Sequence, residues 1–168
     1  MAEIALFIGA EDLNKYSPLV GNLDADKVMG FIEVAQEIHI TNYIGTDLYN
    51  ALQVHALAGT MPAEYSLLVD SYIVPALIRW SLVEYLPTAP YTVANGGVYK
   101  HKSENSESIN KEELDSMVHS VTNTAKHYTK RLIDFMCNNS SDYPEYNTNS
   151  GSDIYPSKND TYGGLYLK

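Results

Sequence analysis

The sequence predicts a mainly α protein: a small helical bundle with one inserted β-hairpin at about 91–100 and an extended C-terminal arm. Three observations predict it. Apolar residues recur at spacings of three and four over most of the first 137 residues, as in amphipathic helices. An Asn-Gly pair at 95–96 lies between β-branched and aromatic residues, which is typical of a hairpin turn. After residue 137 the chain becomes rich in Asn, Ser, Gly and Asp, so we expect a helical domain over 1–137 and an arm over 138–168.

The first long helix is expected from about residue 24 to residue 44 and ends abruptly. Gly45 supplies a residue that stops a helix, and Thr46 follows at once as the expected cap of the next one. Leu48 of that next helix faces inward, and Tyr49 lies beside it. We therefore predict a structural corner made by Gly45, Thr46, Leu48 and Tyr49 that fixes the angle between two helices.

The central buried helix is expected over 75–86, where apolar side chains cover nearly every face. Pro75 must kink or restart the helix that reaches it, because proline lacks an N–H group and clashes with the preceding turn. Arg79 lies in this apolar helix, and a buried guanidinium requires a carboxylate partner. Glu33, Glu37 and Glu84 are the candidates, and the predicted buried ion pair is Arg79 with Glu84.

The hairpin prediction fixes a register. A two-residue turn at Asn95 and Gly96 pairs Ala94 with Gly97, Val93 with Val98, and Thr92 with Tyr99. An isolated two-stranded hairpin is marginally stable in water, so this one needs a helix or another chain to lean on. The expected contact residues between subunits are Val93, Asn95, Gly96, Val98 and Tyr99.

The longest helix is expected to start at Asn110, which forms a capping-box-like pair with Glu113, and to run to about residue 137. The arm that follows lacks the aliphatic residues to fold alone but carries scattered tyrosines. Aromatic anchors in a flexible segment indicate ordering against a partner. The predicted partner-binding residues are Tyr143, Tyr146, Tyr155, Tyr162 and Tyr166.

Composition excludes several classes of function. The net charge of -10 disfavours a sequence-specific DNA or RNA binder, because it repels phosphate. Cys137 is the one cysteine, which excludes an internal disulfide framework and fits a reducing compartment. The N-terminal apolar run is short and preceded by Glu3, unlike a signal peptide, and no apolar run approaches the roughly 18 residues of a membrane span. We expect a soluble protein made in a cytoplasm.

A search for chemistry gives no catalytic, metal or cofactor residue. The phosphate-cradle, dinucleotide, zinc-protease and nucleophile-elbow motifs are missing from the sequence. No glutamate has a histidine three residues later, which excludes a di-iron carboxylate bundle. His119 and His127 share a helix face but stand too far apart to reach one ion unaided. The expectation is a protein that is not an enzyme and holds no cofactor.

The stretch NYIGTDLYNAL at 42–52 resembles the LG-x-x-LY-x-x-L corner of phage head–tail connector proteins, the adaptor rings beneath the portal. Within this group the chain resembles more closely the neck-ring proteins of crAss-like phages and related elements of gut Bacteroides. Further stretches carry the resemblance over most of the chain: FIGAEDLNKYSPLVGNLD at 7–24, PALIRWSLVEYLPTAPYTVANGGVYKHKSENSES at 75–108 and TKRLIDFMCNNSSDYPEYNT at 129–148.

The resemblance implies a virion protein that assembles as a cyclic, head-to-tail ring of about twelve copies. Such a ring docks on the portal protein, contacts further neck and tail ring proteins, and extends the DNA channel toward the tail. DNA passes through without sequence recognition, and no membrane is involved. In this setting the hairpin packs on a neighbouring subunit, the arm threads along the portal or an adjacent subunit, and an acidic inner wall lets DNA slide.

Three alternatives remain open at this point. One is a second-layer neck ring or tail-completion protein. Another is a helical regulatory or enzymatic module, which predicts a cleft with convergent polar groups. The last is a nucleic-acid-binding helical protein, whose binding weakens steeply with salt.

Overall fold

The computed structural model describes residues 4–16, 25–89, 91–94, 97–100 and 110–159, with side chains of the hairpin described only at Tyr91. The chain is mainly helical, as predicted. The helices are α1 (Ala10–Tyr16), α2 (Ala25–Ala35), the π-helical η1 (Gln36–Ile40), α3 (Thr41–Ile44), α4 (Thr46–Ala58), α5 (Ala63–Leu68), the π-helical η2 (Val69–Ile73), α6 (Val74–Tyr85), α7 (Lys111–Asn138) and the 3-10 turns η3 (Ser140–Asp142) and η4 (Pro144–Asn147). The strands are β1 (Tyr91–Ala94) and β2 (Gly97–Lys100).

Two of the helical rods contain a π-helical turn. In the rod formed by α2, η1 and α3, the Thr41 N–H donates to the carbonyl of Gln36, five residues back. In the rod formed by α5, η2 and α6, the Val74 N–H donates to the carbonyl of Val69. The second π turn ends just before Pro75, which lies in the first turn of α6. The predicted restart at Pro75 is thus a widened turn, which accommodates a residue that has no N–H to donate.

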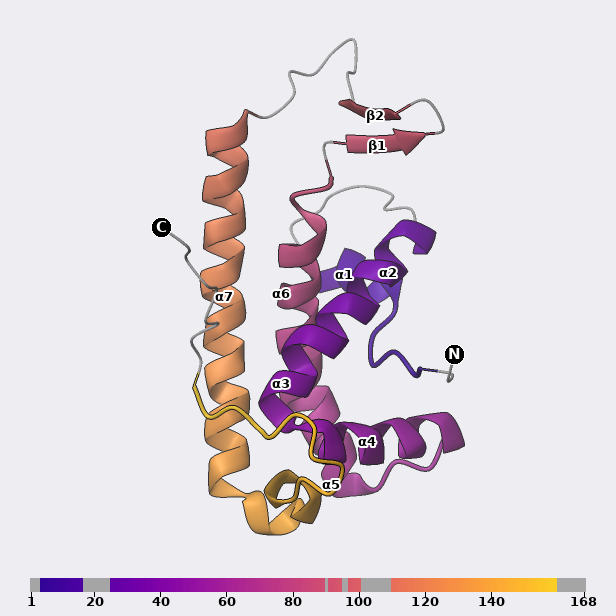
Figure 1. Cartoon of the computed structure of the whole chain (residues 1–168), viewed down its shortest axis with the longest axis vertical. Helices are drawn as coiled ribbons and strands as arrows, with labels where there is room; N and C mark the ends of the chain where they lie inside the picture. The colour runs from indigo at the N-terminus through magenta and orange to yellow at the C-terminus, as the bar shows by residue number, and fades with distance from the viewer. Residues whose placement is uncertain (1–3, 17–24, 90, 95–96, 101–109, 160–168) are drawn as a thin grey trace.

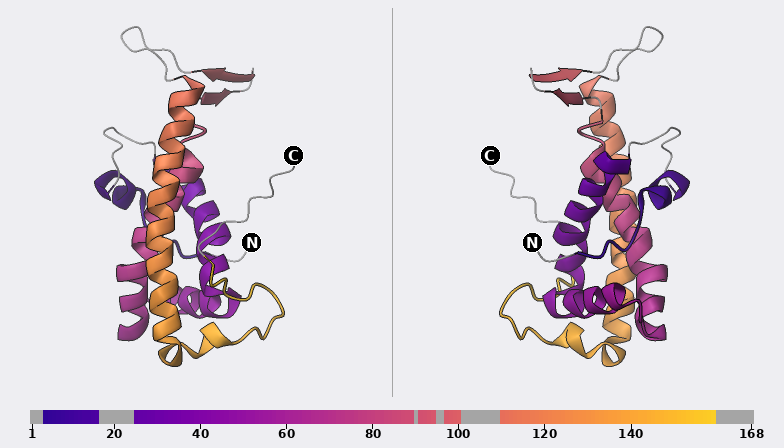
Figure 2. Two further views of the ribbon diagram at one scale, coloured as in Figure 1. Left: turned by 90° about the vertical axis from the view of Figure 1, so that its left-hand side faces the viewer. Right: turned by 90° about the vertical axis from the view of Figure 1, so that its right-hand side faces the viewer.

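The bundle places α6 between α2 and α7, and α7 is its longest helix (Figure 1). Both halves of the predicted capping box at the start of α7 are present: the Glu113 N–H donates to Asn110 Oδ1 at 2.8 Å, and Asn110 N–H donates to Glu113 Oε2 at 3.0 Å. The two side views show α7 standing upright along the whole bundle (Figure 2). Its inner face contains the buried residues Ala125, Thr129, Leu132 and Met136, and Thr129 accepts a hydrogen bond from Trp80 of α6.

The core is built mainly from α6 and the rods that flank it. Trp80, the one tryptophan of the chain, is 2% exposed. Its fully buried neighbours in the core cluster include Ile32, Ile40, Ile44, Leu48, Leu52, Leu68, Ile73 and Leu77. We expected one central buried helix over 75–86, and this part is confirmed.

The rod from Ala63 to Tyr85 is long and apolar enough to cross a membrane by length and composition alone, with a mean hydropathy of 1.4. This differs from the expectation that no apolar run approaches that length, because polar residues such as Asp70 interrupt the run without lowering its average much. Half of its most apolar stretch is buried inside the bundle, and the core helix of a soluble protein passes the same test.

The strands β1 and β2 are antiparallel, with Ala94 opposite Gly97, Val93 opposite Val98 and Thr92 opposite Tyr99. These are the partners that a two-residue turn predicts. The hairpin stands beyond the end of α6, at the end of the molecule opposite to α4 (Figure 1). Asn95 and Gly96 themselves lie outside the described residues.

The chain beyond α7 folds back onto the same bundle. Tyr143 and Tyr146 are each 2% exposed and belong to the core cluster. The Tyr143 hydroxyl donates to the carbonyl of Glu64 at 2.9 Å, and Tyr143 makes edge contacts with Tyr65 and Phe135. Both tyrosines are therefore core residues of this chain, which corrects their assignment as partner anchors.

Candidate functional site

At the predicted corner an N-terminal segment, residues 5–7, and a C-terminal segment, residues 148–157, both attach to the bundle. Gly45 joins α3 to α4 with φ 80° and ψ 158°, a backbone conformation that is essentially restricted to glycine. A Cβ at this position would lie 2.7 Å from Cγ and Cδ of Pro156, far inside van der Waals contact. Gly45 thus has two tasks, to turn the backbone and to leave room for the proline of the C-terminal segment.

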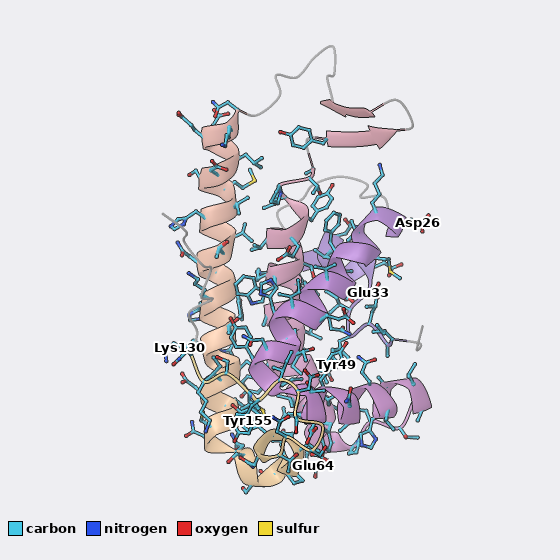
Figure 3. The ribbon with its side chains drawn as sticks, in the orientation of Figure 1. Asp26, Glu33, Tyr49, Glu64, Lys130 and Tyr155 are labelled. Carbon is cyan, nitrogen blue, oxygen red and sulfur yellow. The ribbon has the colours of Figure 1, made fainter. Side chains whose placement is uncertain are left out.

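The inner side of the corner is fixed by burial. Leu48 is fully buried, and Tyr49 is 9% exposed with its ring at the edge of Phe7, 6.1 Å between centroids. Gln36, fully buried in the π turn, donates from Nε2 to the Tyr49 hydroxyl at 3.0 Å. Burial, as the larger effect, raises the pKa of Tyr49. Tyr49 lies near the start of α4, close to the end of the rod formed by α2, η1 and α3 (Figure 3).

Gln36 also binds the N-terminal segment to the corner. Its Oε1 accepts the Phe7 N–H at 2.9 Å, and its Nε2 donates to the Ala5 carbonyl at 2.9 Å. Gln53 of α4 binds the same segment, accepting the Ala5 N–H at 2.7 Å and donating to the Ala5 carbonyl at 2.9 Å. Two side-chain amides therefore replace the backbone partners that an extended segment would find in a sheet.

The outer side of the corner binds the C-terminal segment through Thr46. The Thr46 N–H donates to the carbonyl of Ile154 at 3.0 Å, and the Ile154 N–H donates to Thr46 Oγ1 at 3.2 Å. The Thr46 hydroxyl donates to Asp153 Oδ2 at 2.9 Å. The prediction that Thr46 caps α4 is wrong, because Gly45 occupies the cap position and makes no side-chain bond.

Asp47 holds the preceding part of the same segment. It accepts the Ser150 N–H at 2.8 Å and the hydroxyls of Thr148 at 2.7 Å and Ser150 at 3.1 Å. The Ser150 N–H, followed by the Thr148 hydroxyl, lowers the pKa of this carboxyl below its ordinary value. One further bond, from Ser157 N–H to the Asn42 carbonyl at 2.9 Å, closes the contact on the other side of Gly45.

The corner is therefore a docking site for a short peptide segment, residues 148–157. The corner residues Gly45, Thr46, Leu48 and Tyr49 were predicted, whereas the contacts of Asp47, Asn42 and Pro156 with one another's segments were not. The only local signal was a proline in a polar, tyrosine-bearing stretch. Tyr155 is 52% exposed and lies on this segment, whereas Tyr162 and Tyr166 lie outside the described residues (Figure 3).

A second polar cluster lies inside the bundle around His39. Its ring stacks on Trp80 with 3.9 Å between centroids and 8° between planes, and His39 Nε2 lies 2.8 Å from Glu84 Oε1. Trp80 Nε1 donates to Thr129 Oγ1 of α7 at 2.9 Å. The cluster thus joins the π turn η1, α6 and α7.

The predicted ion pair between Arg79 and Glu84 is wrong. Glu84 pairs with His39, and Arg79 Nη1 donates to the Tyr16 carbonyl at 2.8 Å, while its guanidinium lies over the Tyr128 ring at 5.5 Å. Five residues apart on a helix, the two side chains point to different sides. Arg79 is half-buried, so its charge needs no buried carboxylate.

The buried imidazole predicts a pH dependence of stability. Burial lowers the pKa of His39, and the Glu84 carboxylate opposes this shift. The unfolded chain then binds a proton at higher pH than the folded chain, so the free energy of unfolding falls as the pH drops through the ordinary range of histidine, about pH 7 to about pH 5. Urea unfolding across this range should show a smaller pH slope in His39→Gln than in wild type. An unchanged slope would assign the dependence to other groups.

Three further hairpin residues were predicted as contacts between subunits. The structure does not describe the side chains of these residues, Val93, Val98 and Tyr99. In the described part of the chain, no three His, Cys, Asp or Glu side chains gather as a metal site would require. A surface hollow at the end of the C-terminal segment is lined by Lys130, Ile133, Asp134, Lys158 and Asn159. Lys130 already pairs with Asp134 at 3.3 Å, and no nucleophile with a matching base is placed there.

Taken together, the fold is that of a helical bundle whose corner binds its own C-terminal segment. The chain belongs to a family of unknown function, DUF6712, whose model matches residues 40–155. No curated protein matches the chain, and no solved structure matches it. The matched span runs from the π turn η1 to Tyr155 and includes both Gly45 and most of the segment docked on it.

Proposed function

We propose that this chain is a structural virion protein, a subunit of a head–tail connector ring that docks on the portal and extends the DNA channel toward the tail. The observation that carries the proposal is the corner at 42–52. The stretch that resembles the connector corner is also the stretch where α3 meets α4 and where the N-terminal segment, through Phe7, and the C-terminal segment both make contact. A subunit of a ring needs its helices held at a fixed angle to one another, and these contacts hold α3 and α4 in that way.

The exposed face of α4 supports assembly into a homo-oligomer. Between Asp47 and Glu64 the chain carries no Asp, Glu, Lys or Arg, although its net charge is -10. On this uncharged stretch Val54 is 65% exposed and Leu57 is 50% exposed. An apolar, uncharged helix face on an acidic protein suits a contact with another copy of the chain, because two copies would repel each other elsewhere.

The proposed assembly is a closed cyclic ring of about twelve copies. The hairpin β1–β2, which stands beyond the bundle, packs on a neighbouring subunit, since a two-stranded hairpin is marginal by itself. The acidic charge lets DNA pass without binding. A second-layer neck ring or a tail-completion protein is the alternative position in the same structure, and the helical regulatory or enzymatic module is the alternative of a different class.

The test is the native mass of the chain alone and mixed with the portal ring of the same particle. We expect a complex whose mass corresponds to a complete ring bound to the portal. A chain that remains monomeric and leaves the portal unbound would contradict the portal-adaptor position, and the other neck rings would be tried next.

The matched variants are Val54→Lys, on the uncharged face of α4, and Ser120→Lys, on the exposed side of α7. Both positions are exposed on helices, so neither substitution disturbs the core. Val54→Lys should abolish the ring mass, because it puts a charge into an apolar contact, whereas Ser120→Lys should keep it. Equal ring formation by both variants would exclude the α4 face from the contact.

A further inference from the structure

The segment 153–157 is a self-contained docking unit. Its contacts with the corner consist of the paired bonds between Ile154 and Thr46, the bond from Thr46 to Asp153, and the Ser157 bond to Asn42. Pro156, which is buried, fills the space left by the missing side chain of Gly45. These contacts fix both the position and the direction of the segment, so the corner recognises this short sequence by geometry.

The side-chain hydrogen bonds of the connection to the bundle, from Thr148 and Ser150 to Asp47 and between Asn149 and Asp153, are all exposed. Residues 147–153 are exposed throughout, from the end of η4 to the docking unit. Ser152 has a φ of 54°, in the left-handed region that residues other than glycine rarely adopt, and it follows Gly151. Asp47 holds Thr148 and Ser150 only through exposed hydrogen bonds. The strain and exposure mark residues 147–152 as a hinge.

The docked segment also leaves apolar surface open. Ile154 is 38% exposed and Tyr155 is 52% exposed, whereas the next residue, Pro156, is buried against the corner. Closure within one subunit therefore uses the backbone and the proline but leaves the two neighbouring apolar side chains in water.

We infer that in the assembled ring the docking unit 153–157 of each subunit docks on the Gly45 corner of the adjacent subunit. This inference rests on the proposed ring function and names the contact between its subunits. Every bond of residues 153–157 to the corner is the same whether these residues come from the same chain or from a neighbour, as in domain swapping. The exposed bonds of Thr148 and Ser150 to Asp47 are replaced by bonds to water when the hinge opens. Opening the hinge relieves Ser152, and the exchange is directional, as a head-to-tail ring requires.

The anchor of Tyr146 in the core sets the reach of the segment. An extended stretch of residues 147–152 spans at most about 20 Å, so the corner of the neighbour must lie within that distance of the end of η4. The free chain keeps the segment on its own corner, and assembly exchanges it.

The test uses disulfide formation between two chains that each carry one new cysteine, in a Cys137→Ser background. Thr46 Oγ1 and Asp153 Oδ2 lie 2.9 Å apart, so Thr46→Cys is introduced in one chain and Asp153→Cys in the other. The two chains are mixed, assembled and oxidised. Exchange predicts a disulfide-linked dimer, at twice the subunit mass, in the ring fraction and little of it in the monomer fraction.

A second pair keeps the test decisive if one substitution weakens docking. The Ser157 N–H donates to the Asn42 carbonyl at 2.9 Å, and mixing Asn42→Cys chains with Ser157→Cys chains should give the same dimer, because residues 153–157 move as one. Each single-cysteine chain oxidised alone is the control for random cross-linking. A chain carrying Thr46→Cys and Asp153→Cys together, assembled with an excess of cysteine-free chains, shows whether a disulfide forms within one subunit.

The outcomes separate the two proposals. Rings that form without inter-chain disulfides, while the doubly substituted chain closes internally, would overturn the exchange and leave the ring function standing. A chain that forms no ring, alone or on the portal, removes the ring function and the exchange with it.

Discussion

Replacing Gly45 with alanine is expected to lower the free energy of unfolding by about 3 kcal/mol and to detach the C-terminal segment from the corner. Two effects add. The backbone at φ 80° and ψ 158° is strained for any residue with a Cβ, and the new methyl group would meet the Pro156 ring at 2.7 Å. Urea unfolding measures the first loss, and protease cleavage within 148–157 measures the second.

Gly59→Ala is the matched control for this prediction. Gly59 also has a positive φ of 64°, but it lies in the left-handed helical region and a Cβ there would meet nothing within 4 Å. It should cost about 1 kcal/mol and leave the segment protected. Adding Pro156→Ala to Gly45→Ala should restore part of the loss, because it removes the clash and keeps the strain. Equal effects of Gly45→Ala and Gly59→Ala would mean that Pro156 has no role at the corner.

The sequence predicted the features that depend on local chemistry. The helical class, the capping box of Asn110 and Glu113, the helix end at Gly45 and the buried character of α6 follow from periodicity and from residues that act on their own neighbours. For the same reason the hairpin register follows from the length of its turn.

The features that the sequence did not predict depend on contacts between distant residues. Pro156 meets Gly45 across more than a hundred positions, and nothing near either residue indicates the other. The two π turns are invisible to a pattern analysis that assumes a uniform helical period. One such turn places Gln36 and His39 on the buried side, and this gives Glu84 a partner that was expected to be Arg79.

Tyrosines were misassigned in the arm for a related reason. The stretch after residue 137 has too few aliphatic residues for a core of its own, and this is correct. It does not need one, because Tyr143 and Tyr146 complete the core of the bundle. Burial of Tyr146, close to the Cys137 thiol, raises its pKa to about 12. Composition alone does not distinguish an aromatic that waits for a partner from one that packs on its own chain.

The second large effect is expected from Gln36→Ala, which should lower the free energy of unfolding by about 3 kcal/mol. Gln36 is fully buried and uses both ends of its amide. Its removal leaves the Phe7 N–H without an acceptor, takes a donor from the Tyr49 hydroxyl and opens a cavity behind the corner. The N-terminal segment loses its inner attachment, so hydrogen exchange of the Phe7 amide should become much faster.

Gln53→Ala is the control, because Gln53 binds the same segment through the same kind of amide contact but from a half-buried position on α4. Water replaces its hydrogen bonds, so the loss should be about 1 kcal/mol. If the two variants lose the same free energy of unfolding, the buried amide of Gln36 stabilises the fold no more than the half-buried amide of Gln53 does. The π turn that places Gln36 inside would then not stabilise the corner. If Gln36→Ala alone also frees the segment 148–157 to proteolysis, then the inner and outer attachments of the corner are coupled through Tyr49 and the start of α4.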